Sequence, residues 1–307
     1  MSAESGTLVF STNLAPTEIS VMNWQPRRKA FREVLNANRC VYPGSVYDPI
    51  SARIAENVGF EIGMFAGSIA SLAVLGDPDH ILITLSEFAD QAYRINRASS
   101  IPLMVDADHG YGNALNVMRT VQELDNAGVS GLSIEDTDLP LAFGSGGKAR
   151  LLSVEEGAKK MKAAVEARSD TGVAIAARTS APLLANLDDT LARVQAYQEC
   201  GVDALFLIGV KTRADLDRIS ETANLPIILG GAGEELKDLD YLSSKGVRIC
   251  LQGHQPFMAA VQACYSTLRS LRDGVSPAQL EGLPDKTLLR DLDRSEKFDQ
   301  WIEDYLQ

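Results

Sequence analysis

Short apolar runs alternate with longer amphipathic segments along most of the chain. The apolar runs are rich in strand-forming residues and have the length of buried strands. Several follow a glycine that ends an amphipathic segment, as in NVGFEIGMF and ECGVDALFLI, where the glycine predicts a left-handed helix cap. The eight predicted strands span residues 40–46, 60–65, 101–105, 131–134, 173–177, 204–210, 226–229 and 247–251.

The segments between these runs have the length and periodicity of helices, clearest at residues 27–38, 85–99, 114–127 and 256–272. Strands that alternate with helices predict a parallel sheet, and runs that are apolar throughout predict strands buried on both faces. Eight such units in about 250 residues predict a (β/α)8 barrel of the TIM type. The alternative is a doubly wound open sheet, which usually has a G-x-G-x-x-G loop after its first strand. The stretch VYPGSVYD does not match that loop, so the barrel is favoured.

We expect a single domain over residues 1–307. Residues 1–26 are predicted to form an irregular N-terminal arm, and residues 39–272 the barrel with its eighth helix. Residues 273–307 form a C-terminal helical extension that exceeds what a barrel needs, so we expect it to pack on a neighbouring subunit.

The composition narrows the class of partner. The chain has 307 residues, 45% of them hydrophobic, and a net charge of −12. That charge argues against nucleic acid or an anionic membrane as the main partner, but not against a small anionic substrate. The N-terminus lacks a basic region followed by a long apolar run, so we expect no signal peptide, and no stretch approaches the roughly 20 apolar residues of a membrane helix. The four scattered cysteines predict reduced, mostly buried thiols, so we expect a soluble cytoplasmic protein.

Acidic residues follow two neighbouring predicted strands. Asp106 and Asp108 end the first in DADHGYGN, and Glu135 ends the next in GLSIED, on the same face as Ser133. Residues two apart on a strand share a face, so Asp106 and Asp108 are predicted to lie together at the carboxyl rim, where barrel enzymes carry their sites.

Three carboxylates at one rim repel one another unless a cation lies between them. Oxygen ligands of this kind suit Mg²⁺, which keeps several waters and shares its other positions with substrate oxygens. The alternative is that these acids are solvated loop residues or helix caps. D-A-D and I-E-D at successive strand ends favour the metal site, whereas the adjacent His109 is expected to stabilise the turn.

Three further strand ends carry candidate groups. Arg178 follows the fifth strand, where it could hold a carboxylate through two hydrogen bonds or form an ordinary salt bridge with a rim acid. His254 follows the eighth strand and could bind a carboxylate, move a proton, or be structural. Gly67 and Ser68 follow the second strand and allow backbone N–H groups and a hydroxyl to approach an anion.

These motifs together resemble the isocitrate lyase/phosphoenolpyruvate mutase superfamily. The similarity covers residues 39–254 and follows the order VYPGSVYDPISARIAENVGFE, AGS, LGDPD, DADHGYGN, IED and AART. It implies a (β/α)8 barrel whose eighth helix is exchanged with a partner subunit, in a homotetramer built as a dimer of dimers. It also implies Mg²⁺, with Mn²⁺ as an alternative, and a 2-oxo acid that passes through an enolate.

The resemblance assigns roles to individual residues. Asp106 would be the direct metal ligand, and Gly67 and Ser68 would bind the substrate carboxylate with help from Arg178. The acids that would hold metal-bound waters are Asp79 of LGDPD, Asp108 and Glu135.

One departure from the family pattern is informative. Members that cleave carbon–carbon bonds by an aldol-type route carry K-[KR]-C-G-H in a loop after the IED strand. Here the loop is LPLAFGSGGKARLLS, without cysteine or histidine, which argues against isocitrate or methylisocitrate lyase activity. The D-P-[IM]-SAR opening, LITLSEF and the G-H pair ending in His254 are more similar to the oxaloacetate decarboxylase branch, where this histidine contacts substrate.

The chemistry expected of that branch is the loss of CO₂ from oxaloacetate to give pyruvate. Oxaloacetate chelates Mg²⁺ through its C1 carboxylate and C2 ketone, and the metal stabilises the negative charge that develops on the ketone oxygen. This step removes no proton from carbon, consistent with the missing cysteine. The enolate then takes a proton from His254, a tyrosine or a metal-bound water.

A second departure leaves alternatives open. After the seventh predicted strand the chain reads LGGAG, with Gly230, Gly231 and Gly233 where relatives often present a larger polar side chain. This could admit a bulkier C3 substituent or mark a different substrate. The alternatives are therefore another activity of the superfamily, on a phosphonopyruvate or substituted malate, or a non-catalytic oxo-acid-binding protein. A phosphonate should need extra cations, which TSAPLLANLDD lacks.

The loop after the fourth strand contains Gly144, Gly146 and Gly147. These glycines make it flexible enough to act as a lid over the site, although glycine-rich loops are also ordinary connections.

Overall fold

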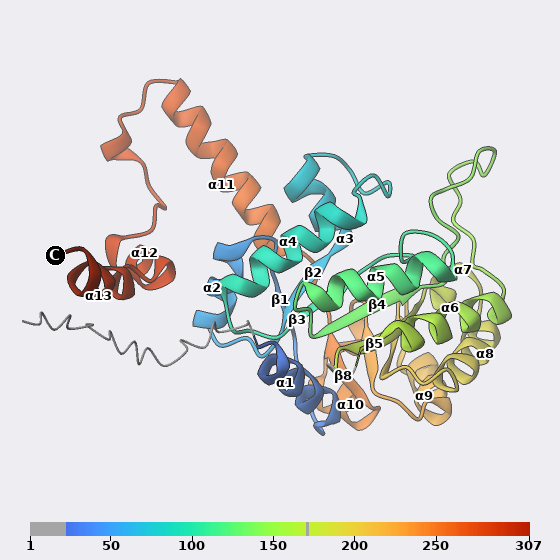
Figure 1. The fold of residues 1–307 in the computed structure, drawn as a ribbon. Coiled ribbons are helices and arrows are strands. Elements are labelled where there is room, and N and C mark those ends of the chain that lie inside the picture. The colour runs from blue at the N-terminus through green and yellow to red at the C-terminus, as the bar shows by residue number, and fades with distance from the viewer. Residues whose placement is uncertain (1–22, 170–171) are drawn as a thin grey trace, which may run out of the picture.

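The computed structural model describes residues 23–169 and 172–307 and contains one sheet of eight parallel strands in sequence order (Figure 1). An isolated bridge between Val41 and Ile249 joins the first segment to the last strand. This closes the sheet and confirms the predicted (β/α)8 barrel. The strands are β1 Gly44–Ser45, β2 Gly63–Ala66, β3 Leu103–Asp106, β4 Gly131–Glu135, β5 Ala174–Thr179, β6 Ala204–Leu207, β7 Ile227–Leu229 and β8 Val247–Cys250.

Each of the eight predicted apolar runs overlaps one of these strands, but the first strand is much shorter than predicted. β1 has two residues, and the rest of that run joins the barrel through the Val41 bridge. The predicted N-terminal arm lies mostly outside the described residues.

Helices surround the barrel on its outer face, and their starts follow local capping chemistry (Figure 1). Asp48, Thr84 and Asn113 each begin a helix with a reciprocal capping box. Such caps satisfy backbone N–H groups that a helix leaves free at its start. The helices of the barrel are α1 Gln25–Asn36, α2 Pro49–Asn57, α3 Gly67–Ala70, α4 Leu85–Ala98, α5 Ala114–Asn126, α6 Val154–Ala167, α7 Ala181–Leu184, α8 Leu187–Gln198, α9 Arg213–Thr222 and α10 Leu239–Ser244.

The glycines that were predicted to end helices do so. Gly59, Gly128, Gly201 and Gly246 all have φ between +79° and +87°. A residue with a Cβ is strained in this left-handed region, so glycine is the favoured residue where the chain turns from helix into strand.

The core has two parts, one between the sheet and the helices and one inside the barrel. Helix α1 closes the amino end of the barrel with Phe31, which is 1% exposed. Its ring lies over Gly131, where a Cβ would be 2.4 Å from Phe31 Cε1. The carboxyl end of the barrel is left for polar groups.

The chain after β8 leaves the barrel. Helix α11, Gln255–Arg272, has no buried residue and extends away from the sheet (Figure 1). It is followed by α12, Lys286–Asp293, and α13, Ser295–Leu306. Part of this extension returns to its own chain, because Leu292 is 6% exposed and its carbonyl accepts a hydrogen bond from Arg53 at 3.0 Å.

The cysteines and the absence of a predicted membrane helix were the remaining expectations from composition. All four cysteines are free thiols, and three of them, Cys40, Cys200 and Cys250, are buried. Among the described residues, no helix combines the length and the apolar character that a membrane span requires. The cytoplasmic location stays a prediction.

The packing of Phe31 at the amino end generates a stability prediction. Phe31→Ala should lower the free energy of unfolding by about 3–5 kcal/mol, because it leaves a cavity in the barrel interior. Urea unfolding followed by circular dichroism measures this. The matched control is Phe143→Ala, since Phe143 is fully exposed; it should change stability by no more than about 0.5 kcal/mol. Equal losses in the two variants would contradict this account of the core.

Candidate active site

Two of the predicted acids end neighbouring strands and meet at the carboxyl mouth of the barrel. Asp106 is the last residue of β3 and Glu135 the last of β4. The register places Asp106 beside Ser133, whose hydroxyl donates a hydrogen bond of 2.8 Å to Asp106 Oδ1. Asp106 is 8% exposed and Glu135 4% exposed. Both carboxyl groups are therefore held in a largely dehydrated position.

Asp108 joins them for a different reason from the one predicted. Strand β3 ends at Asp106, and Asp108 has φ +48°, so strand alternation does not extend to it. Its position depends on Gly67 instead: a Cβ at residue 67 would lie 2.1 Å from Asp108 Oδ2. The Asp108 carbonyl also accepts a hydrogen bond of 2.8 Å from the Glu135 backbone N–H. A tight turn thus brings the second acid to the mouth.

Arg178 lies between the acids. Its guanidinium forms an ion pair with Asp106 and lies 3.3 Å from Glu135 Oε2. Arg178 therefore forms the salt bridge with rim acids that the sequence analysis gave as one alternative. Burial alone would lower the Arg178 pKa, but Asp106 and Glu135 raise it above its ordinary value. Its Nε has no hydrogen-bond partner among the described residues, which leaves one donor free for another group.

The charges at the mouth do not balance. Burial raises the pKa of the Asp108 carboxyl well above its ordinary value, and the neighbouring Asp106 and Asp79 raise it further. Burial also raises the pKa of Glu135, although Arg178 opposes this. Three buried acids face the Arg178 guanidinium, and the buried Lys160 ammonium lies 3.3 Å from the Glu135 backbone carbonyl oxygen. Even with Lys160 counted, negative charge is in surplus, which fits a divalent cation.

The donor set fits Mg²⁺ better than a metal held by protein ligands alone. In the described part of the chain, no three His, Cys, Asp or Glu side chains are arranged to hold a metal ion directly. Mg²⁺ commonly takes one or two carboxylates and keeps several waters. Asp79 is exposed but lines the same cavity as Asp108 and Glu135, so a hydrated ion there would have these acids around it.

The two aromatic residues of the DADHGYGN loop were not assigned to the site from the sequence. Tyr111 is electrostatically close to Asp108, and its buried hydroxyl has no partner among the described residues. The G-Y-G pattern around it was the available signal. His109 does not line the acid cavity, and burial lowers its pKa to about 4. Its predicted role in the turn stays a prediction, since its buried Nδ1 finds no partner in the described chain.

His254 lies where β8 passes into α11. Its Nδ1 is 2.9 Å from the Ser45 hydroxyl, a partner that the sequence did not reveal. Burial lowers the His254 pKa, and the charge of Asp106 partly opposes this, which places the imidazole within electrostatic reach of the acids. The predicted role of His254 in binding or proton transfer stays a prediction.

Asp136, the neighbour of Glu135, has a structural role. It is completely buried and accepts hydrogen bonds from Arg193 at 2.8 Å and from the Tyr197 hydroxyl at 2.6 Å. These partners lie on α8, so Asp136 ties the end of β4 to the outer helices.

The cavity at the mouth has a volume of about 620 Å³. Part of its wall comes from the predicted lid, through residues 139–141 and Gly147. Gly144, Gly146 and Gly147 all have positive φ, and a Cβ on any of them would meet no atom within 4 Å. The lid glycines therefore lie in open surroundings, while closure itself stays a prediction.

The glycine-rich end of β7 does not leave an empty space. A Cβ at Gly230 would lie 2.0 Å from Ile208 Cδ1, so the side chain of Ile208 occupies the room that a larger residue 230 would take. At Gly230 this space is therefore filled by Ile208, while room for a bulkier C3 substituent elsewhere along these glycines stays a prediction. Gly233 approaches the Lys211 carbonyl closely, while a Cβ at Gly231 would meet nothing within 4 Å.

Comparison with known proteins is consistent with this geometry. A family model described as phosphoenolpyruvate phosphomutase matches residues 31–272. The chain belongs to the phosphoenolpyruvate mutase/isocitrate lyase superfamily. This confirms the resemblance found from the motifs, and the match includes every predicted site residue.

Relatives within the superfamily are similar over nearly the whole chain. An oxaloacetate decarboxylase from Bradyrhizobium sp. (strain ORS 278) is 55% identical over 93% of this chain and 99% of its own. The crystal structure of phosphoenolpyruvate phosphomutase from Streptomyces platensis subsp. rosaceus superposes with a TM-score of 0.80 at 26% identity, covering 91% of this chain and 99% of that one. A phosphonopyruvate hydrolase in complex with oxalate and Mg²⁺ gives 0.79 at 27% identity, covering 92% and 99%.

The buried acid surplus generates a pH-dependent prediction. Because the folded state raises the pKa of Asp108, it retains a proton that the unfolded chain has lost above about pH 4. The metal-free protein should therefore lose stability as pH rises from about 4 toward the raised pKa of Asp108 in the folded state. Asp108→Asn removes that loss and keeps a residue that tolerates φ +48°.

In EDTA at pH 7, Asp108→Asn should melt roughly 2–4 °C higher than the parent, the shift that about 1 kcal/mol gives in a chain of this size. The difference should vanish near pH 4. Added Mg²⁺ should stabilise the parent more than the variant. A variant that melts below the parent at pH 7 in EDTA would contradict the charge surplus.

Proposed function

We propose that this protein decarboxylates oxaloacetate to pyruvate and CO₂ with Mg²⁺ as cofactor. The observation that carries the proposal is 55% identity over 93% of the chain to a protein named oxaloacetate decarboxylase. The buried acids and the guanidinium at the barrel mouth support it, because they match what a chelating 2-oxo acid and a divalent cation require.

In this proposal Asp106 contacts the metal, while Asp79, Asp108 and Glu135 hold its waters, and Mn²⁺ is an alternative ion. Bound Mg²⁺ would supply Lewis-acid stabilisation of negative charge on the ketone oxygen of the substrate. The burial of Asp106 and its hydrogen bond from Ser133 fix one carboxylate oxygen, so the other is the one directed to a ligand or to Arg178.

The remaining predicted site residues would bind the substrate and donate the proton that C3 takes up after CO₂ leaves. The backbone N–H groups of Gly67 and Ser68 would bind the C1 carboxylate, together with the free Nε of Arg178. The C3–C4 bond breaks, its electron pair passes into the C2–C3 bond and the ketone oxygen, and C4 leaves as CO₂. C3 then takes one proton. His254 is the chain's own candidate donor, with Tyr111 as the alternative among residues near the acids.

The lid supports decarboxylation over aldol-type cleavage. Aldol-type cleavage needs a base to take a proton from a hydroxyl and an acid to return one to carbon. The lid residues 139–149 include neither cysteine nor histidine. Decarboxylation needs no base, so the lid has only to exclude water.

The activity prediction is direct. The parent should release pyruvate from oxaloacetate with Mg²⁺ faster than the metal-catalysed background, and EDTA should abolish the excess. Asp106→Ala should lower kcat/KM by about 100-fold or more, since several kcal/mol of charge stabilisation depend on the metal. The exposed acid of the Asp90–Arg94 pair provides the control, Asp90→Ala, which should match the parent. A parent rate equal to background would sink the proposal. Mg²⁺-dependent oxalate binding without turnover would indicate the non-catalytic alternative.

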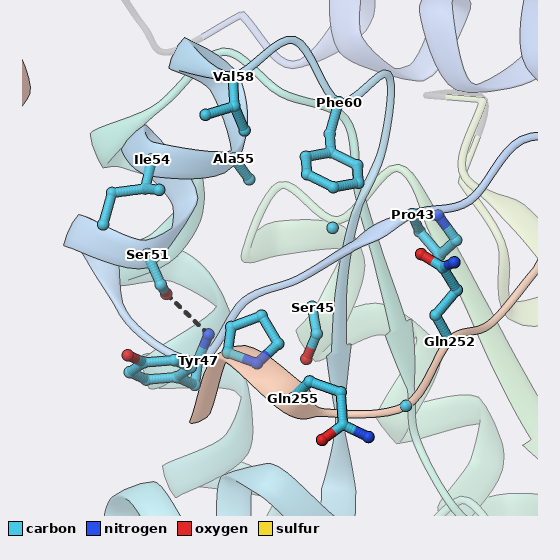
Figure 2. A pocket seen from close by; sticks show the side chains of 13 residues that line it. Pro43, Ser45, Tyr47, Ser51, Ile54, Ala55, Val58, Phe60, Gln252 and Gln255 are labelled. Carbon is cyan, nitrogen blue, oxygen red and sulfur yellow. Dashed lines mark hydrogen bonds between the residues drawn. The ribbon is translucent and has the colours of Figure 1, made fainter. Parts of the chain in front are cut away.

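We further propose that the protein is a homotetramer in which α11 is exchanged between subunits. The outer face of α11 carries exposed apolar residues at helical spacing, Met258, Val261, Tyr265 and Leu268, each at least 49% exposed. Beside β1 and α2 lies a groove of about 510 Å³ where an eighth barrel helix would pack (Figure 2). Its apolar wall includes Ile54, Val58 and Phe60. The chain's own α11 extends away from the barrel, so a second copy is the occupant that the superfamily pattern favours.

Light scattering after gel filtration tests this assembly. The parent should have the mass of a tetramer, and the double variant Tyr265→Asp/Leu268→Asp should shift to smaller species, because two charges are then placed on the apolar face. Ala263 lies on the opposite side of α11, so Ala263→Asp is the matched control and should leave the mass unchanged. A monomeric parent, or equal effects of both changes, would overturn the exchange of α11.

A further inference from the structure

We propose that Ile208, admitted by Gly230, is the specificity-determining residue of the site and forms an apolar wall against the C3–C4 end of the substrate. This inference rests on the proposed function. It concerns the half of the mouth that carries no acid, and it explains why the end of β7 is glycine.

The geometry begins at the carboxyl ends of two neighbouring strands. Ile208 and Gly230 immediately follow β6 and β7, and both face inward: Ile208 packs against the interior core, and a Cβ at Gly230 would meet Ile208 and Phe206. Backbone hydrogen bonds fix both positions: Ile208 N–H donates to Thr179 O at 3.0 Å, and Gly230 N–H donates to Leu207 O at 2.9 Å. The two residues therefore compete for one volume at the mouth.

Ile208 takes that volume. A Cβ at residue 230 would be 2.0 Å from Ile208 Cδ1 and 3.4 Å from Phe206 Cε2. Atoms of this kind cannot approach so closely, so any side chain at 230 would displace Ile208. The overlapping atom is the end of the Ile208 side chain, so an alanine at residue 230 would push this methyl group aside, and glycine after β7 lets Ile208 keep its observed position after β6.

The position of Ile208 relative to the charged groups fixes which part of a substrate it meets. Glu135, Arg178 and Phe206 are neighbours in register across β4, β5 and β6, so the mouth runs from acid to guanidinium to apolar wall. A 2-oxo acid whose chelating C1–C2 end lies at the acids and Arg178 extends its C3–C4 end toward β6. Ile208, Leu183 and Leu184 line the cavity there.

This wall suits the loss of a carboxylate. Arg178 is the only lysine or arginine among the described residues that line the cavity, and it is already paired with Asp106 and Glu135. The C4 carboxylate would be charged and would meet the apolar Ile208 side chain without a cationic partner, whereas the departing CO₂ is neutral and apolar. An apolar wall therefore disfavours the bound carboxylate more than the transition state that leads to CO₂. The same wall offers no counter-charge to a phosphonate.

The steric part of the inference is tested by a double-mutant cycle on kcat/KM for oxaloacetate. Gly230→Ala should lower kcat/KM by about 10- to 100-fold, the effect of displacing a group at a reacting centre by about 1 Å. In the Ile208→Ala background the same change should cost less than about 3-fold, because the methyl group then enters vacated space. An equal cost in both backgrounds, or a harmless Gly230→Ala, would overturn the pairing of the two residues.

The chemical part is tested by a matched pair of nearly isosteric changes. Ile208→Val keeps the wall apolar and should retain kcat within about 3-fold. Ile208→Thr has the shape of valine with one hydroxyl and should lower kcat about 10-fold or more, because the hydroxyl solvates the bound carboxylate. Equal kcat values for the two variants would overturn the role of the apolar wall.

Oxalate separates this inference from general damage to the site. Oxalate has only the chelating end of the substrate and does not reach Ile208. Its Mg²⁺-dependent dissociation constant, measured by calorimetry, should stay within about 2-fold of the parent in all four single variants and the double variant. Weakening in step with kcat/KM would overturn the assignment. A parent that fails to decarboxylate oxaloacetate would refute the proposed function, whereas an active parent with uncoupled variants would refute only this inference.

Discussion

The electrostatic repulsion among three nearly dry carboxyl groups is the constraint on which the site depends. Asp106, Asp108 and Glu135 are each at most 8% exposed, and they outnumber the nearby cations, which are the Arg178 guanidinium and the Lys160 ammonium beside Glu135. A fold tolerates such an arrangement only where its backbone over-determines the position of each acid. Here two strand ends, a close approach at Gly67 and a left-handed Asp108 provide that determination. In the proposed function, the stability that the metal-free protein loses through this repulsion would be recovered as affinity for the divalent cation.

The carboxyl rim of the barrel has a charged side and an apolar side. Strands β3 and β4 end in the acids Asp106 and Glu135, and β5 carries Arg178 as its last residue but one, whereas Ile208 and Gly230 immediately follow β6 and β7. Because all carboxyl ends meet on one rim, a ligand of four carbons spans both halves. In the proposed pose, the charged side binds the chelating C1–C2 end of the substrate, and the apolar side keeps water from the C3–C4 bond that breaks. A substrate with two charged ends therefore meets unequal surroundings, which gives decarboxylation its direction.

The sequence predicted the barrel because periodicity and glycine caps are local signals: Gly59, Gly128, Gly201 and Gly246 mark their turns without reference to the rest of the fold. It also predicted the acids, since strand ends of a parallel sheet converge. It failed where a contact joins distant segments. The Ser45–His254 hydrogen bond, the packing of Asp108 on Gly67 and the occupation of the Gly230 space by Ile208 each link residues at or just after the ends of different strands. The residues that follow one strand do not show which side chain from a neighbouring strand end will pack against them.

The position of His254 connects assembly to chemistry. This residue immediately precedes α11, the helix that leaves the barrel, and its Nδ1 is held by Ser45. Ser45 also lines the groove beside α2, next to the turn into α11. In the proposed exchanged dimer, the incoming helix would pack against the residue that orients the imidazole, and the outgoing helix would fix the backbone from which the imidazole projects. The incoming and the outgoing helix would therefore both influence the hydrogen bond between Ser45 and His254. Such an assembly would make the orientation of His254, the proposed proton donor, depend on the partner subunit, because neither Ser45 nor His254 belongs to the interior core.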